Sequence, residues 1–303
     1  MIRKLCYRIY HKLQKNYFSL VLISKLQKMQ ITTLLGDMIC YPSIIRNMKN
    51  PNQETMRARK FYKENREGVK NVLSMLEDEK SKAVYRNVIA YRTGKALIKR
   101  DMYSLWDQYF CKDIIRLQNG EVFIDGGAYV GDTIERLIKE AKKQKVKIQH
   151  IVAFEPGNDN YTILRKKFSG GGIPVAMIKK GLSDSEKCLH FLERGSSSGF
   201  VSTHNKSDSE SVPVPVIDID SVKECRDATF IKMDIEGAEM DALYGARKTI
   251  LHNHPKLAVC IYHSDADMIR IAAYIHELVP EYRLYVRHHT RRDHETVLYA
   301  VIG

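Results

Sequence analysis

The sequence predicts an α/β fold in which helices flank a mostly parallel sheet, and two observations support this prediction. From residue 121 onward, short runs rich in valine and isoleucine alternate with amphipathic stretches, the pattern of repeated strand–helix units. Near the end, the predicted strands 282–288 and 295–301 are too close in sequence for a helix to lie between them. They should therefore form an antiparallel hairpin, so that the doubly wound sheet finishes with one antiparallel strand.

The alternation of apolar and polar residues places the individual elements. Besides the hairpin, the predicted strands cover residues 121–126, 150–155, 175–182, 188–193, 212–219, 229–235 and 256–262. The predicted helices cover residues 131–143, 158–168, 238–252 and 265–279. Residues 195–211 are polar and begin with a run of serines, so we expect them to form a surface loop.

The first hundred residues have a different, helical character. Residues 54–100 carry apolar side chains at helical spacing, whereas residues 1–50 form an apolar and basic stretch that ends at the turn signal around Pro51. We therefore divide the chain into a basic helical N-terminal region, residues 1–100, and an α/β domain, residues 101–303.

The net charge of +13 originates in this N-terminal region, which holds 22 lysines and arginines against 7 acidic residues. A solvated helical face explains the excess most simply, with acidic glycans or a membrane surface as alternative partners. The sequence contains no arginine-rich cluster with interleaved aromatic residues, so it does not indicate nucleic-acid binding. The apolar run at 17–23 is too short to cross a bilayer, and the six cysteines form no Cys-x-x-Cys pair. We expect a cytoplasmic protein with reduced thiols, for which weak association with a membrane surface stays open.

A glycine-rich turn follows the first predicted strand. It contains Asp125, Gly126, Gly127, Ala128, Gly131 and Thr133, between an apolar strand and the start of a helix. At the carboxyl end of a parallel strand, such a turn brings bare backbone close to a ligand. We therefore predict that the glycines shape a ligand-binding turn and that Asp125 lies at the strand tip beside it.

A second acidic residue ends the second predicted strand. Glu155, followed by Pro156, comes 30 residues after Asp125, where a carboxylate can accept hydrogen bonds from both hydroxyls of a ribose. Nicotinamide enzymes also use an acid here, and Tyr244 and Lys248 match the Tyr-x-x-x-Lys pair of short-chain dehydrogenases. Because no serine precedes Tyr244 at the distance that site needs, we attribute the match to chance.

Charged residues alternate where a later strand ends. Lys232, Asp234 and Glu236 should fall on one side of the strand at 229–235. Three charges at the end of a buried parallel strand would be costly inside a plain core, but they suit a strand tip that opens onto a cleft. Lys232 also has a structural alternative, as the ion-pair partner of Asp234.

Over residues 121–301 these motifs resemble the FkbM family of S-adenosylmethionine-dependent methyltransferases. The segments that carry the resemblance are 121–133, 154–156, 181–184, 230–239 and 295–300, and weaker similarity extends upstream through 85–92 and 108–110. The resemblance implies a Rossmann-like class I methyltransferase fold, S-adenosyl-L-methionine as cofactor, and a saccharide or natural-product hydroxyl as the methyl acceptor. It also implies that Ser183 and Asp184 lie near the adenine.

The chemistry of methyl transfer to an alcohol suggests the catalytic residues. The acceptor hydroxyl must lose a proton, and the candidate bases are Asp234 and His263, which follows the strand at 256–262. Lys232 is the third candidate catalytic residue, and a structural role for His263 stays equally open. Asp234, Glu236 and His263 could hold a divalent ion, but neither their spacing nor their number requires one, so we expect no metal.

Two further expectations concern the acceptor and the alternatives. His288, His289 and His294 fall in the hairpin connection, where they could line the acceptor pocket, although a solvated basic turn is the simpler interpretation. An inactive protein that retains the fold is the alternative to an enzyme, although the joint presence of Asp125, Glu155 and Asp234 argues against it. The sequence decides neither the acceptor nor the oligomeric state.

Overall fold

The computed structural model describes residues 48–192 and 211–303. The predicted helical stretch at 1–50, apart from its last three residues, and most of the loop at 195–211 lie outside the described residues. Within them, no helix combines the length and the apolar composition needed to cross a bilayer.

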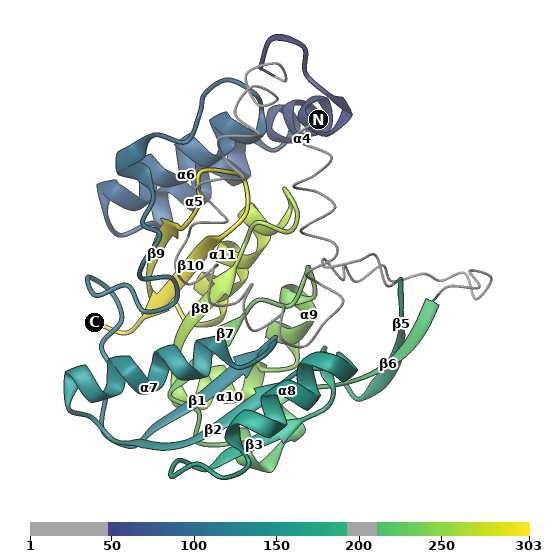
Figure 1. The fold of residues 1–303 in the computed structure, drawn as a ribbon. Helices are drawn as coiled ribbons and strands as arrows, with labels where there is room; N and C mark the ends of the chain where they lie inside the picture. The colour runs from purple at the N-terminus through teal and green to yellow at the C-terminus, as the bar shows by residue number, and fades with distance from the viewer. Residues whose placement is uncertain (1–47, 193–210) are drawn as a thin grey trace, which may run out of the picture.

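A seven-stranded sheet forms the centre of the molecule, with strand order β3-β2-β1-β7-β8-β10-β9. Its strands are β1 (Glu121–Gly126), β2 (Ile148–Phe154), β3 (Val175–Ile178), β7 (Phe230–Met233), β8 (Lys256–Cys260), β9 (Arg283–His288) and β10 (Thr296–Val301). All neighbours pair in parallel except β10, which is antiparallel to both β8 and β9. The predicted α/β fold with an antiparallel last strand is confirmed, and Figure 1 shows the β9–β10 hairpin in yellow.

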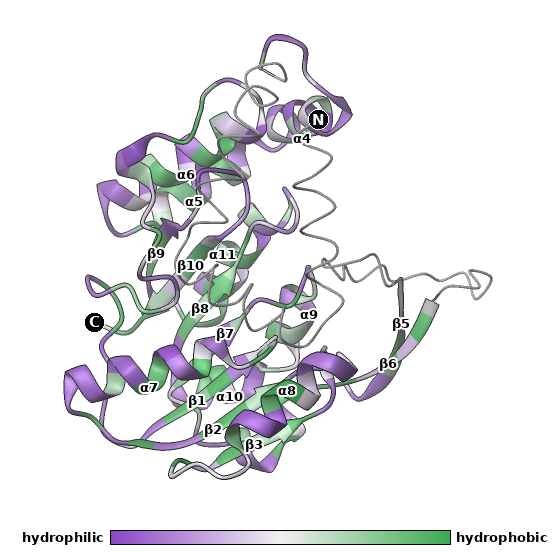
Figure 2. Cartoon of the chain, viewed as in Figure 1, coloured by the Kyte–Doolittle hydropathy of each residue, from purple (hydrophilic) through white to green (hydrophobic). Residues whose placement is uncertain are grey.

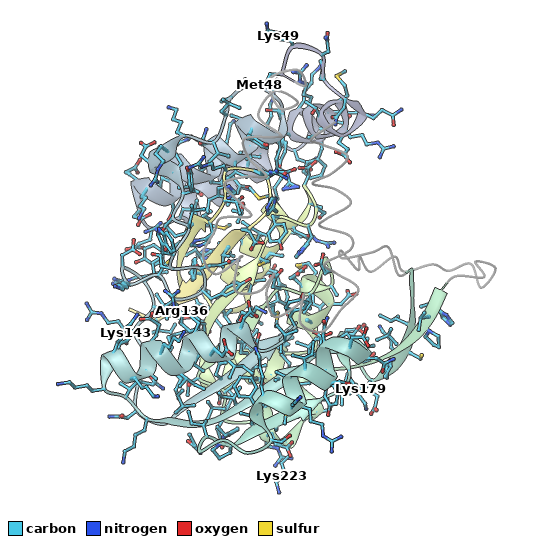
Figure 3. All side chains as sticks on the ribbon, viewed as in Figure 1. Met48, Lys49, Arg136, Lys143, Lys179 and Lys223 are labelled. Atoms are coloured by element: carbon cyan, nitrogen blue, oxygen red, sulfur yellow. The ribbon has the colours of Figure 1, made fainter. Side chains whose placement is uncertain are left out.

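Helices cover both faces of this sheet. One face carries α7 (Asp132–Gln144) and α8 (Asn158–Phe168) over residues such as Phe123 and Phe230. The other packs against α5 (Arg66–Met75), α6 (Glu79–Arg92), α9 (Glu239–Tyr244), α10 (Arg247–Asn253) and α11 (Asp267–Leu278). Because successive strand residues point to opposite faces, Phe123 and Ile124 contribute to different cores. Figure 2 shows largely apolar central strands, and Figure 3 shows Lys143 and Lys223 extending outward from the rim.

Two predicted elements are corrected by the structure. The strand expected at 175–182 is two strands: β3 joins the main sheet, whereas β4 (Gly181–Leu182) joins β5 (Lys187–Leu192) and β6 (Ser211–Ile217) in a separate three-stranded sheet. The prolines of β6, Pro213 and Pro215, have no N–H to donate, which disfavours a place inside a fully bonded central sheet. Figure 1 shows β5 and β6 projecting from the body of the molecule.

The helix expected at 238–252 is also divided, into α9 and α10. Gly245 lies at the break, where an added Cβ would come within 2.1 Å of the Ser183 carbonyl oxygen. The chain therefore leaves the helical path where it passes close to the turn after β4. Gly245 in turn accepts a hydrogen bond from the Asp220 N–H at 2.9 Å.

The helices of the N-terminal region are part of the same core as the sheet. α4 (Gln53–Glu64) leads into α5 and α6, and α6 packs along β9, as Figure 1 shows. Asp78 caps α6 by accepting from the Ser81 N–H at 2.7 Å, and it also pairs with Arg287 of β9 at 2.7 Å. Residues 48–100 therefore stabilise the α/β domain through the contacts of α6 with β9.

Substitution of Tyr85 tests this shared core. Its side chain is completely buried in α6, and its hydroxyl donates to the Met268 carbonyl of α11 at 2.8 Å. The Tyr85→Phe variant loses this buried hydrogen bond, so we expect a loss of about 0.5–1.5 kcal/mol in the free energy of unfolding, measured by urea denaturation. Tyr161→Phe is the control, because Tyr161 is only partly buried and its bond to Met177 is longer, 3.2 Å. Equal losses in the two variants would contradict the prediction.

Candidate active site

The glycine turn after β1 owes its shape to close internal contacts. Gly127 has φ +75°, and a Cβ there would lie 2.0 Å from the Asp234 carbonyl oxygen at the end of β7. Gly131, at φ +80°, is the residue that precedes α7. A Cβ added to it would lie 2.3 Å from the ring of Phe168 in α8. Ala128 and Thr133 are buried beside them. The glycines thus let the β1 turn touch both the tip of β7 and the neighbouring helix.

A buried ion pair and two hydrogen bonds stabilise this turn. Lys232 Nζ lies 3.0 Å from Asp125 Oδ1 and donates to the carbonyls of Gly126 and Gly127 at 3.0 and 2.8 Å. Burial alone would lower the pKa of Lys232, but the charges of Asp125 and Asp234 together outweigh it and keep the amine protonated. The alternative that Lys232 pairs with Asp234 is therefore corrected: its salt-bridge partner is Asp125, on the adjacent strand.

Glu155 connects the β1 turn to the β2 turn. One carboxylate oxygen accepts from the Tyr129 N–H and the other from the Gly157 N–H, both at 2.8 Å. The side chain is 6% exposed, and burial raises its pKa although these hydrogen bonds oppose the rise. Pro156 follows in a half-buried position. Glu155 therefore lies where the two turns meet, next to the exposed ring of Tyr129, which is 37% accessible.

Asp234, just beyond β7, is held by two tyrosines. Tyr109 donates its hydroxyl to Oδ2 at 2.7 Å, and Tyr262 donates to Oδ1 at 3.0 Å. Burial would raise the pKa of Asp234, but Lys232, His263 and the two hydroxyls lower it overall. The carboxylate is therefore ionised near neutral pH. Sequence reasoning missed both tyrosines as site residues.

His263 lies among three carboxylates. Its Nδ1 is 3.0 Å from Glu239, and its Nε2 is 3.6 Å from both Asp234 and Glu236. Burial alone would lower its pKa, but the hydrogen bond to Glu239 and the surrounding negative charge raise the pKa to about 9. His263 is consequently an imidazolium at neutral pH and cannot accept a proton in that state.

The same cluster is one of two places in the described residues where three side chains could share a metal ion. Asp234, Glu239 and His263 present ligand atoms within 4.8 Å of one another. Histidine ligates metals only as neutral imidazole, so a metal would have to displace the proton that His263 holds. The other group is built around Cys111, whose thiol pKa burial raises to about 12.

Glu295, immediately before β10, is a further carboxylate that sequence reasoning did not assign to the site. Gln108 donates one N–H to Glu295 and another to the Tyr109 hydroxyl, which links Glu295 to Asp234. Burial, with the added charge of Asp234, raises the pKa of Glu295 to about 7. The signal was present, since the segments 108–110 and 295–300 both belong to the family resemblance.

The structure places the remaining predicted residues around this centre. Ser183 is buried in the turn after β4, where its N–H donates to Ile217 at 3.0 Å. Asp184 is half exposed and pairs with Lys187, which lowers its pKa. None of the contacts above links this turn to Glu155.

The expectation of a solvated histidine turn is wrong for two of its three members. His288 is 1% and His289 is 4% exposed, and each is hydrogen-bonded, to Thr296 and to the Ser104 carbonyl respectively. Burial lowers the pKa of both, to about 3 for His288 and about 4 for His289, so they are neutral packing residues. Only His294 stays substantially exposed, with 41% of its side chain accessible.

Comparison with known proteins identifies this arrangement. The family model described as the methyltransferase FkbM domain matches residues 125–292, which include the turn, Glu155 and the carboxylate cluster. This chain belongs to the FkbM methyltransferase family. No curated protein matches the chain.

One solved structure of an FkbM methyltransferase has a similar fold. The crystal structure of methyltransferase FkbM from Methylobacillus flagellatus KT aligns with a TM-score of 0.65 at 24% identity, over 80% of this chain. The alignment covers 60% of that longer chain. The CMeT domain of the citrinin polyketide synthase aligns with a TM-score of 0.36 at 11% identity, over 62% of this chain and 48% of its own.

The protonation of His263 gives a prediction for this FkbM methyltransferase. A pKa that rises on folding stabilises the protein below the unfolded value of about 6.5, and the gain disappears as pH rises through about 9. Wild type should therefore exceed His263→Gln by up to about 3 kcal/mol in unfolding free energy at pH 6, and by much less at pH 9.5. Urea denaturation across this range measures the difference. His252→Gln, at an exposed position of α10, is the control, and a constant difference for His263→Gln would contradict the assignment.

Proposed function

We propose that this chain is an S-adenosylmethionine-dependent O-methyltransferase that methylates a saccharide hydroxyl. The observation that carries the proposal is the ionised Asp234, held by two tyrosine hydroxyls at the tips of β7 and β8, directly against the glycine turn of β1. This is the crevice at the carboxyl ends of parallel strands where ligands bind in doubly wound sheets. Membership of the FkbM methyltransferase family supports a methyl donor as that ligand.

The charges of the site suit a cationic cofactor. Two cations, Lys232 and His263, face a larger number of acids, namely Asp125, Glu155, Asp234, Glu236 and Glu239. Both oxygens of Asp125 and one of Glu239 have no hydrogen-bond donor among the described residues, although Asp125 Oδ1 is ion-paired with Lys232. Such an acidic excess is compatible with the sulfonium and ammonium groups of S-adenosylmethionine and would oppose a pyrophosphate.

Specific residues would hold that cofactor. Glu155 lies between the two turns, where its carboxylate would receive the ribose hydroxyls, and the backbone at Gly126 and Gly127 would face the methionine part. Ser183 and Asp184 remain the proposed adenine contacts. When bound, S-adenosylmethionine supplies an electrophilic methyl group on its sulfonium.

The chain's own groups then have to orient a hydroxyl and accept its proton. His263 is protonated, and Asp234 is a weak base because its pKa is lowered, so both serve better as fixed charges that orient the acceptor. Glu295 is half-buried and has a pKa of about 7, close to the value that suits a general base at neutral pH. We therefore assign proton acceptance to Glu295, with Gln108 and Tyr109 connecting it to Asp234.

The nicotinamide alternative loses support from the positions of its two marker residues. Tyr244 ends α9, is 50% exposed and packs on Tyr274, whereas Lys248 lies in α10. The pair does not share one continuous helix as a Tyr-x-x-x-Lys motif requires.

Ligand-induced stabilisation tests the cofactor directly. A ligand present at about 100 times its dissociation constant adds roughly 2.7 kcal/mol to the folded state, so S-adenosylhomocysteine and S-adenosylmethionine should each raise the melting temperature and NAD should not. A shift with NAD alone would overturn the proposal. No shift with any ligand would favour the inactive fold.

Substitution of Glu155 tests the ribose contact. Glu155→Gln removes the charge and places an amide N–H against a backbone donor, so we expect about tenfold or greater loss of S-adenosylhomocysteine affinity by calorimetry. Asp159→Asn is the matched control, since it removes an exposed carboxylate in the first turn of the adjacent α8. Unchanged affinity in Glu155→Gln would remove the residue from the site.

The base assignment predicts a pH profile. With an accepted sugar, the wild-type kcat should rise through about pH 7 as Glu295 ionises, and Glu295→Gln should lower kcat by about 10²-fold or more and abolish that limb. S-adenosylhomocysteine affinity should stay unchanged. Glu281→Gln, at an exposed position, is the control. A Glu295→Gln variant that keeps the wild-type pH limb would return the role to Asp234.

A further inference from the structure

A polar groove separates the N-terminal helices from the carboxyl end of the sheet. Its volume is about 660 Å³, within the range of small-molecule sites. One wall comes from α4, the end of α6 and the segment after it, including Thr55, Arg57 and Ala96. The other comes from the segment after β8 and the β9–β10 connection, including Ser264 and His294. Figure 1 shows the N-terminal helices at the end of the molecule that also holds β9 and β10.

The groove adjoins the proposed reaction centre. Tyr262 and His263 both line it, and both contact Asp234, at 3.0 and 3.6 Å. A molecule lying in the groove can therefore come close to the carboxylate cluster. The donor site and the groove would meet at Asp234.

An arginine from the N-terminal region fixes the wall that carries these residues. Arg92, the last residue of α6, donates both terminal N–H groups to the Tyr262 carbonyl at 2.8 and 3.0 Å. Its Nε also pairs with Asp265 at 2.9 Å. The groove is thus a built feature in which helix α6 positions the segment after β8.

The lining chemistry defines the class of ligand. The groove offers carboxylates, guanidinium groups, hydroxyls and an amide, and its few apolar members are small or flexible, such as Ala58, Ala96 and Met48. The acids Glu54, Asp265 and Asp293 are roughly balanced by Arg57, Arg92 and His263. A surface with many alternating donors and acceptors and little net charge suits an uncharged polyhydroxylated molecule better than an apolar ligand or a polyanion.

We propose that this groove is the acceptor site, and that it binds an uncharged glycosyl unit whose hydroxyl projects past Tyr262 and His263 toward Asp234. The inference rests on the proposed O-methyltransferase function and adds where the sugar binds. The proposal also assigns a function to the N-terminal helices: α4 and the end of α6 supply one wall of the groove and so determine which sugars fit.

The test fills the groove without touching the reaction centre. Ala96→Trp places a large side chain in the groove, and Lys95→Trp is the matched control because it adds the same side chain one residue away at an exposed position that does not line it. The probes are the methyl α-glycopyranosides of glucose, mannose, galactose and rhamnose, with methyl glucuronide as an anionic comparison. Saturation-transfer NMR measures their binding, and calorimetry measures S-adenosylhomocysteine in parallel.

We expect at least one neutral glycoside to bind wild type and Lys95→Trp, and its signal to fall about tenfold or more in Ala96→Trp. S-adenosylhomocysteine affinity should be the same in all three proteins, and equal melting temperatures show that each is folded. An undiminished glycoside signal in Ala96→Trp overturns the groove as the site. Binding of the glucuronide alone, or of no glycoside, overturns the ligand class. Failure of S-adenosylhomocysteine to bind wild type refutes the proposed function instead, which keeps the two failures distinct.

Discussion

The buried pair between Lys232 and Asp125 is the interaction on which the site depends. The ammonium group is ion-paired with the Asp125 carboxylate and donates hydrogen bonds to the carbonyls of Gly126 and Gly127. The pair therefore fixes the β1 turn against β7, next to Asp234. Charges buried to this extent are costly unless they are fully paired, so the arrangement is sensitive to the loss of either partner.

The electrostatics of the site separate groups that are chemically similar. Asp234 and Glu295 are both carboxylates near the tips of the sheet, yet the pKa of Asp234 is lowered by Lys232 and two tyrosine hydroxyls, whereas burial raises that of Glu295 to about 7. The pKa of His263 lies above that of a free histidine because three carboxylates surround the ring. Environment, more than residue type, therefore decides which of these groups is charged at neutral pH.

The described part of the N-terminal region packs into the α/β domain. Helix α6 contributes Tyr85 to the core, and its N-terminal capping residue, Asp78, forms an ion pair with Arg287 of β9. The helix ends in Arg92, which donates hydrogen bonds to the Tyr262 carbonyl. The boundary at residue 100 therefore marks a change in the sequence pattern, from helical periodicity to alternating strands and helices. The described part of this region shares its core with the sheet.

Local sequence determined the order of strands and helices, the closing hairpin, the glycine turn and the placement of Asp125, Glu155 and Asp234 at strand ends, because side-chain periodicity and turn chemistry act over a few residues. Tertiary structure decided which distant residues meet. It joined Lys232 to Asp125, brought Tyr109 and Tyr262 onto Asp234, and broke the helix at Gly245 where another turn passes. It also set the protonation of His263 and Glu295, since a pKa depends on burial and on neighbours that periodicity does not specify.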